Sequence, residues 1–215
     1  MVTLQLRQLE VPPGQRLLLH DVAWSEFESI LDELGEHRSS RIAYDNGLLE
    51  IMAPLPEHEF AKEMISDLLK AFLEELDIEF LTLGSTTFKK AEMLKGIEPD
   101  QCFYIQNEAA VRGKTRLDLS VDPPPDLAIE VDITSRTHPE TCAALGIPEL
   151  WRRTGAMIHI YQLKDGQYDE VETSPTFSGW ALHHEIPRYI ARSQDKGRNT
   201  TMRLFRQWVR DQRNR

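Results

Sequence analysis

Acidic side chains interrupt the most strand-like stretch of the chain, residues 126–132 (Asp-Leu-Ala-Ile-Glu-Val-Asp). A β-strand directs alternate side chains to opposite faces, so Asp126, Glu130 and Asp132 share one face. Three prolines precede the strand and a Thr-Ser pair follows it, which bounds it at both ends. The opposite face is apolar and mostly β-branched, with Leu127, Ile129, Val131 and Ile133.

This acidic face has two interpretations. Neighbours on one strand face lie roughly 6–7 Å apart, and carboxylates that close raise each other's pKa unless a cation lies between them. The face could be the solvated outer side of a half-buried strand, but such faces usually mix acids with Thr, Lys and Arg. We favour a site for a hard cation, because Mg²⁺ prefers one or two carboxylates and keeps several waters.

Two further residues could complete such a site. Asp100 follows a proline and opens a predicted strand over 100–105, from which it could approach the acidic strand. An aspartate after proline also commonly forms a local turn. His58 lies near the start of a predicted helix, at the edge of its apolar stripe. A histidine there is more often structural than functional, and both interpretations stay open.

Local patterns predict the elements that precede these residues. A Ser-x-x-Glu capping box at Ser25 opens a helix over 24–36. An Asn-Gly pair between two apolar runs predicts a hairpin with a type I′ turn over 41–52. An apolar stripe at helical spacing predicts a long helix over 56–76.

The remainder of the chain alternates strands and helices, which predicts an α/β domain with a central mixed β-sheet flanked by helices. The length of 215 residues fits a single domain, 1–215. Its expected parts are an N-terminal helix and hairpin (1–55), a core (56–182) and basic C-terminal helices (183–215). Further strands are expected over 78–83, 85–89, 126–133, 158–163 and onward to 182, and further helices over about 139–145, 187–193 and 200–212.

Composition indicates a globular protein of a reducing compartment. Hydrophobic residues make up 40% of the chain and charged residues 28%. Its two cysteines give neither a disulfide framework nor a Cys-rich zinc site. The chain opens without a signal-like segment and has no apolar run of membrane-spanning length, so we expect no membrane partner and a cytoplasmic location.

The net charge of -10 is unfavourable for a protein that binds nucleic acid. Residues 192–215, however, carry eight basic residues against two acids, a local charge of +6 that leaves -16 for residues 1–191. This segment could contact phosphates or form a dimer surface. Its arginines could equally lie on the solvated face of a last helix, which is the interpretation we prefer.

Several segments together resemble one known family. They are Pro99-Asp100, Pro125-Asp126-Leu-Ala-Ile-Glu130-Val-Asp132-Ile-Thr-Ser135 and Leu145-Gly-Ile-Pro-Glu-Leu-Trp151. Similarity extends through residues 56–59, 85–87, 98–105 and 208–210, so it covers nearly the whole chain. The combined pattern is similar to the Uma-two family of proposed endonucleases, within the PD-(D/E)XK superfamily. The resemblance implies a restriction endonuclease-like fold that hydrolyses DNA phosphodiester bonds with Mg²⁺, or with Mn²⁺ in its place. It also suggests a homodimer.

The resemblance assigns roles to individual residues. Asp100 and Glu130 would be the metal ligands. The superfamily's lysine, two residues after the glutamate, is Asp132 here, which would assist or tune the site. Many relatives have a lysine and a tyrosine in the following helix, where this chain has His138 and Cys142.

A substitute positive charge could come from Lys89 or its neighbour Lys90, although surface lysines are the commoner case. The catalytic candidates are therefore Asp100, Glu130, Asp132, His58 and Lys89, in a Mg²⁺-dependent DNA endonuclease. The alternative is a weak or inactive nuclease-like scaffold that serves as a nucleic-acid or protein interaction module. The chain lacks the Gly-x-Ser-x-Gly elbow, the phosphate-binding loop and the His-Glu-x-x-His zinc helix of other hydrolases.

Overall fold

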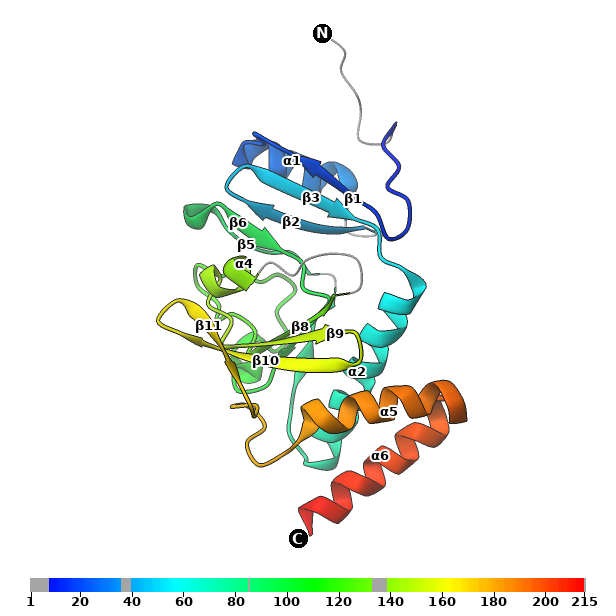
Figure 1. Ribbon diagram of the computed structural model, residues 1–215. Helices are drawn as coiled ribbons and strands as arrows, with labels where there is room; N and C mark the ends of the chain where they lie inside the picture. Colours follow the sequence, from blue (N-terminus) through cyan, green and yellow to red (C-terminus); the bar gives the residue numbers. More distant parts are fainter. Residues whose placement is uncertain (1–7, 36–39, 85, 133–138, 215) are drawn as a thin grey trace.

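Two β-sheets carry the fold in the computed structural model, which describes residues 8–35, 40–84, 86–132 and 139–214 (Figure 1). The first sheet has five strands in the order β1-β3-β2-β6-β5, and every neighbouring pair is antiparallel. Helix α1 (Trp24–Leu34) packs on this sheet around the buried side chains of Phe27 and Tyr44. The strands are β1 (Arg16–Leu19), β2 (Arg41–Asp45), β3 (Leu48–Met52), β5 (Phe88–Lys90) and β6 (Lys95–Ile97).

The second sheet has six strands in the order β11-β10-β9-β8-β7-β4. Strands β8 and β9 are parallel and the other pairs are antiparallel. The mixed sheet that the sequence predicts is therefore confirmed, with the acidic strand at its centre. The strands are β4 (Leu81–Thr82), β7 (Gln101–Tyr104), β8 (Leu127–Asp132), β9 (Glu149–Thr154), β10 (Met157–Lys164) and β11 (Gln167–Val171).

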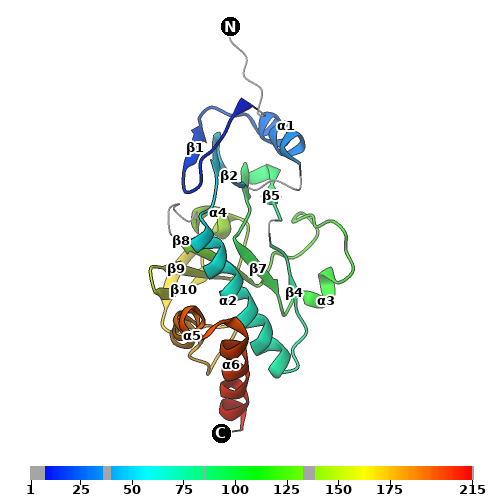
Figure 2. The same cartoon turned by 90° about the vertical axis from the view of Figure 1, so that its right-hand side faces the viewer.

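Helices cover both faces of the six-stranded sheet. Helix α2 (Pro56–Glu75) and helix α5 (Leu182–Lys196) pack on one face, around Leu127, Ile129 and Val131. Helix α4 (Pro139–Ala144) packs on the other face, where its Cys142 joins a second apolar cluster. Figure 2 shows α2 running from the five-stranded sheet down to the C-terminal helix α6 (Arg198–Arg213). Two short helical segments, η2 (Ala91–Met93) and α3 (Glu108–Val111), complete the elements.

Local structure confirms the hairpin and corrects two boundaries. Asn46 and Gly47 both have positive φ, of 46° and 92°, as the type I′ turn requires. The capping box is displaced: α1 begins after Ala23, whose N–H donates to Glu26 Oε2 at 2.7 Å, so the box does not start at Ser25. Helix α5 begins at Leu182, earlier than predicted, and continues through Pro187 in its second turn, where a proline removes one backbone hydrogen bond of the helix.

The arginines of α6 do not form a free basic face. Each ion pair joins α6 to α2: Arg198 to Asp67 and Arg210 to Glu75, both at 2.6 Å. Arg206 lies 2.6 Å from Glu74 and also contacts Glu75. Three of the eight basic residues in 192–215 therefore pair with acids of α2 and hold the last helix against it.

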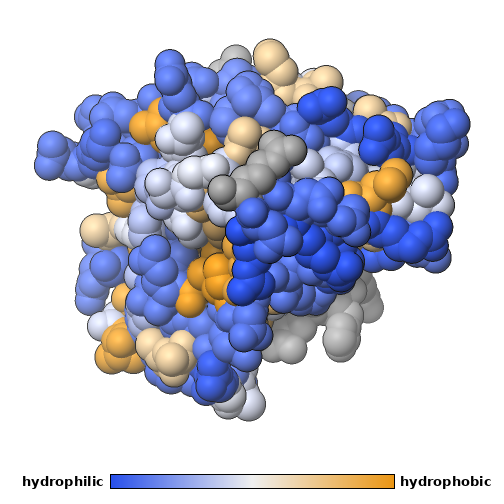
Figure 3. All heavy atoms as spheres, turned by 90° about the horizontal axis from the view of Figure 1, so that it is seen from below, coloured by the Kyte–Doolittle hydropathy of each residue, from blue (hydrophilic) through white to orange (hydrophobic). Residues whose placement is uncertain are grey.

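The surface seen from below is mostly hydrophilic, with hydrophobic side chains in small patches and in one central recess (Figure 3). None of the helices in the described part of the chain is both long enough and apolar enough to cross a membrane.

Candidate active site

Asp100 is held by contacts from three distant parts of the chain. It precedes β7 and is only 3% exposed. Its Oδ2 accepts a hydrogen bond from the backbone N–H of Val131 at 2.8 Å and lies 2.9 Å from Nε2 of His58. Its Oδ1 lies 3.9 Å from Nε of Arg41. These contacts fix the carboxylate beside the acidic strand, as the cation-site interpretation requires.

Glu130 is buried on β8 and incompletely partnered. The residue is only 9% exposed, and its Oε1 has no hydrogen-bond partner among the described residues. Burial, the charge of Asp100 and the charge of Asp132, in that order, raise its pKa well above the ordinary value, against the opposing effect of Arg41. Asp100 and Glu130 thus lie close enough to perturb each other.

The acidic face is not a solvated outer face. Ala128 is fully buried on it, and Asp126 is only 4% exposed. The reason is helix α4, which packs over this side of the sheet with Cys142 buried beside Glu130. Burial raises the pKa of the Cys142 thiol, with a smaller contribution from Glu130. His138 lies outside the described residues.

Asp126 has a structural role. Its carboxylate accepts hydrogen bonds from the backbone N–H groups of Ile105 and Asn107, at 2.7 and 3.0 Å, and from the Asn107 side-chain amide at 2.7 Å. These three bonds tie the loop after β7 to the start of β8. Asp126 is therefore not available to a cation.

Asp132 is ion-paired across the parallel strand pair. Its Oδ2 accepts hydrogen bonds from Nε and Nη2 of Arg152 on β9, at 3.0 and 2.5 Å. Burial alone would lower the pKa of Arg152, but the bond and charge of Asp132 outweigh it and raise that pKa. The position that the resemblance assigns to a lysine is thus occupied by an acid, Asp132, which forms an ion pair with Arg152.

His58 and Lys62 bring polar groups from the first turns of α2. His58 is 1% exposed and Lys62 is 7% exposed. Lys62 Nζ lies 2.5 Å from Oε2 of Glu59, whose Oε1 lies 3.8 Å from Arg41. Burial alone would lower the pKa of His58, but its contacts with Asp100 and Glu59 raise it.

Sequence reasoning missed Arg41, the cation beside Asp100, and Lys62, which is linked to Arg41 through Glu59. Lys62 follows His58 by four residues, a spacing that places both on one helix face, and this was the available signal. Arg41 gave no such signal, because it opens β2 and reaches the site through the pairing of β2 with β6, the strand that leads into Asp100.

Lys89 does not join the carboxylates. It lies on β5 in the five-stranded sheet, and its Nζ is 2.8 Å from Glu28 of α1. Neighbouring Phe88 points the opposite way, into the apolar cluster shared with α4. The prediction of Lys89 as a substitute for the superfamily's lysine is therefore not supported by its position, since it faces α1.

The candidate centre consists of two carboxylates. Across the described ranges, no group of three or more His, Cys, Asp or Glu side chains is arranged to hold a metal ion. A cation at Asp100 and Glu130 would need water or backbone carbonyl oxygens to complete its coordination, which is usual for Mg²⁺. The buried Oε1 of Glu130 without a partner fits such an ion.

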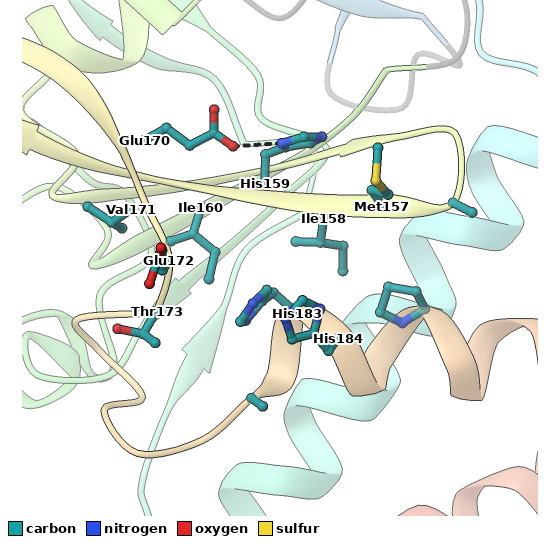
Figure 4. Close-up of a pocket in the computed structure, with 13 residues that line it drawn as sticks. Met157, Ile158, His159, Ile160, Glu170, Val171, Glu172, Thr173, His183 and His184 are labelled. Atoms are coloured by element: carbon teal, nitrogen blue, oxygen red, sulfur yellow. Dashed lines mark hydrogen bonds and ion pairs between the residues drawn. The ribbon is translucent and has the colours of Figure 1, made fainter.

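The histidine pair of the C-terminal region lies elsewhere. A pocket of 690 Å³ lies between the β10–β11 hairpin and the first turn of α5. Figure 4 shows His183 and His184 below β10 and His159 with Glu170 above it, so these histidines do not converge on one point. The His183 and His184 rings lie 3.9 Å apart, and neither residue contributes to the carboxylate centre.

Two comparisons with known proteins gave matches. A family model named Uma2 and described as "Putative restriction endonuclease" matches residues 24–192. A crystal structure of a protein described as a putative nuclease belonging to DUF820, from Anabaena variabilis, aligns with a TM-score of 0.54 and 14% identity. The alignment covers 79% of this chain and 99% of that one, which shows a shared fold. None of the curated proteins matches the chain.

Proposed function

The chain belongs to the Uma2 family of restriction endonuclease-like proteins, and from this premise we propose that it hydrolyses DNA phosphodiester bonds with a divalent cation, Mg²⁺ or Mn²⁺, at Asp100 and Glu130. The observation that carries the proposal is the buried Glu130, whose Oε1 has no partner among the described residues and whose neighbours include a second carboxylate. A buried anion beside another anion is costly unless a cation joins them. A divalent ion between these groups would remove both the repulsion and the unsatisfied acceptor.

Each neighbouring residue has a definable part in this proposal. The Val131 N–H and His58 fix the orientation of Asp100, so that one of its oxygens is held and the other faces Arg41. A bound Mg²⁺ would polarise the scissile phosphate and lower the pKa of the attacking water. Arg41 and Lys62 would supply the positive charge that the superfamily's lysine usually provides.

Asp132 would act on the centre indirectly. Its charge contributes to the raised pKa of Glu130, while its own carboxylate is engaged by Arg152. Arg152 therefore weakens the attraction of Asp132 for a cation bound to Glu130. We assign it a tuning role rather than that of a ligand.

Cleavage assays with matched variants test the proposal. Wild type is incubated with plasmid, linear duplex and single-stranded DNA in Mg²⁺, Mn²⁺ or EDTA, beside Asp100→Asn and Glu130→Gln. Asp169→Asn and Glu172→Gln are the matched controls, because both residues are exposed and lie outside the centre. We expect cutting by wild type and by both controls in Mg²⁺ or Mn²⁺, and a loss of about 10²-fold or more in the two site variants.

Equal cutting by Glu130→Gln and Glu172→Gln would overturn the assignment of the centre. Absence of cutting by wild type with either metal would favour the other hypothesis, a nuclease-like scaffold that binds nucleic acid or protein without catalysis. Binding is measured separately, as the rise in melting temperature on adding Mg²⁺ or Mn²⁺ to wild type and to Glu130→Gln. A ligand that binds only the folded state raises that temperature.

A further inference from the structure

A second pocket opens on the same sheet face as the carboxylate centre. It has a volume of 530 Å³ and lies between α4 and strands β9 to β11. The parallel register pairs Glu130 with Arg152, so the two residues share a face, and Arg152 lines the pocket. The pocket therefore begins next to the proposed catalytic centre, without using its ligands.

Arg152 joins the pocket to the acidic strand. Its Nε and Nη2 donate to Asp132, and its guanidinium lies 5.8 Å from the centroid of the Tyr161 ring, on the pocket wall. Its side chain remains 26% exposed. A fixed, partly exposed guanidinium at the end nearest the carboxylates suits an anionic group such as a phosphate.

The other walls suit a planar ring. Ala143 and Ala144 of α4 are small and half-buried, and they leave an apolar floor rather than filling the space. Gln167, at the start of β11, is exposed at the rim, where its amide can donate and accept hydrogen bonds. An apolar cavity of this size with a few polar groups is typical of a small-molecule site.

We propose that this pocket binds one unpaired nucleotide of the DNA strand, next to the phosphate that is cut, with its base against Ala143 and Ala144 and its phosphate toward Arg152. The proposal rests on the proposed nuclease function and adds a substrate class to it. A base can enter the pocket only when it is unstacked, so single-stranded or locally opened DNA is preferred over intact duplex.

The test measures binding without cleavage. Ca²⁺ replaces Mg²⁺, and fluorescence anisotropy follows a short labelled single-stranded oligonucleotide and a duplex of the same sequence. Ala143→Phe fills the pocket from α4, and Gln167→Trp fills it from the exposed rim, where folding is least affected. Ala109→Phe on α3 is the matched control, because Ala109 is exposed and lies outside the pocket.

Both pocket-filling variants are expected to bind the single strand about tenfold more weakly than wild type and the control, because the base no longer has room to enter the pocket. Wild type is expected to bind the single strand more tightly than the duplex. Arg152→Gln is expected to reduce the slope of log Kd against log salt concentration by about one phosphate contact. Melting temperatures confirm that each variant is folded.

If both pocket variants bind the single strand as tightly as Ala109→Phe does, the subsite is overturned. It is also overturned if wild type does not bind the single strand at all. If metal-dependent plasmid cutting persists in those cases, only the subsite fails. If wild type cuts no DNA but the pocket variants still lose single-strand binding, the catalytic proposal fails and the subsite stands.

Discussion

Glutamine in place of Glu130 should stabilise the metal-free protein at neutral pH. The wild-type side chain is buried, its Oε1 has no partner among the described residues, and burial together with Asp100 and Asp132 raises its pKa. Glutamine keeps the shape, removes the charge and brings an amide that can donate to Asp100. Because an uncompensated buried charge costs more than a buried neutral amide, we expect a gain of about 1–3 kcal/mol in the free energy of unfolding. For a chain of this length, each kcal/mol corresponds to about 2–4 °C in Tm.

The gain should depend on pH with a definite sign. The pKa of Glu130 in the folded protein lies above its ordinary value, 4.5, which describes the unfolded chain. Below that ordinary value, both states hold the proton and the wild-type protein loses nothing. As the pH rises from that ordinary value to the folded-state pKa, the wild type loses stability relative to the variant, because only its folded state still holds the proton. The difference in Tm between Glu130→Gln and wild type should therefore be small at about pH 4 and larger at about pH 8.

Calorimetry or dye-monitored melting in EDTA, across this pH range, measures the effect. Glu172→Gln is the control, since it makes the same chemical change at an exposed position. Mg²⁺ should raise the Tm of wild type more than that of Glu130→Gln, which reverses part of the difference. A variant that melts below wild type in EDTA at neutral pH would refute the reasoning, because Glu130 would then stabilise the fold without a cation.

Three other substitutions test the remaining assignments. Asp126→Ala leaves the loop after β7 without an acceptor for three hydrogen bonds and should lower the free energy of unfolding by about 2–4 kcal/mol in urea titration; a loss under 1 kcal/mol would contradict its structural role. Lys89→Ala removes an exposed ion pair with Glu28, so stability should change by less than about 1 kcal/mol and DNA cutting should be unchanged; a large loss of cutting would restore Lys89 to the site. His58→Gln keeps a donor toward Asp100 but loses the ring's charge. Because the folded-state pKa of His58 is raised, the stabilisation that its protonated form contributes is complete below pH 6.5 and is lost as pH rises through the folded pKa. The variant should therefore be more destabilised at about pH 6 than at about pH 9, and an equal difference at both would exclude a charged His58.

Short-range patterns were sufficient for most of the elements. Alternation of apolar and acidic residues located β8, the Asn-Gly pair located the β2–β3 turn, and the apolar stripe located α2 within one residue of its end. These features depend on neighbours a few residues apart, so the sequence contains them directly. Strand β9 was not predicted, because Arg152 and Arg153 break the apolar run that a buried parallel strand normally shows.

The proximity of Asp100 to Glu130 was also available from the sequence, through the family resemblance and the position of Asp100 at the start of a second predicted strand. What the sequence left open was whether that acidic face is solvated, and the packing of α4 over it decided the question. The sequence also misplaced the positive charge. It offered Lys89, whereas the pairing of β2 with β6 brings Arg41 to Asp100. Lys62 of α2 is linked to Arg41 through Glu59, which both contact. Contacts between residues far apart in the chain depend on how elements pack, and a pattern that repeats every two or four residues carries no information about that packing.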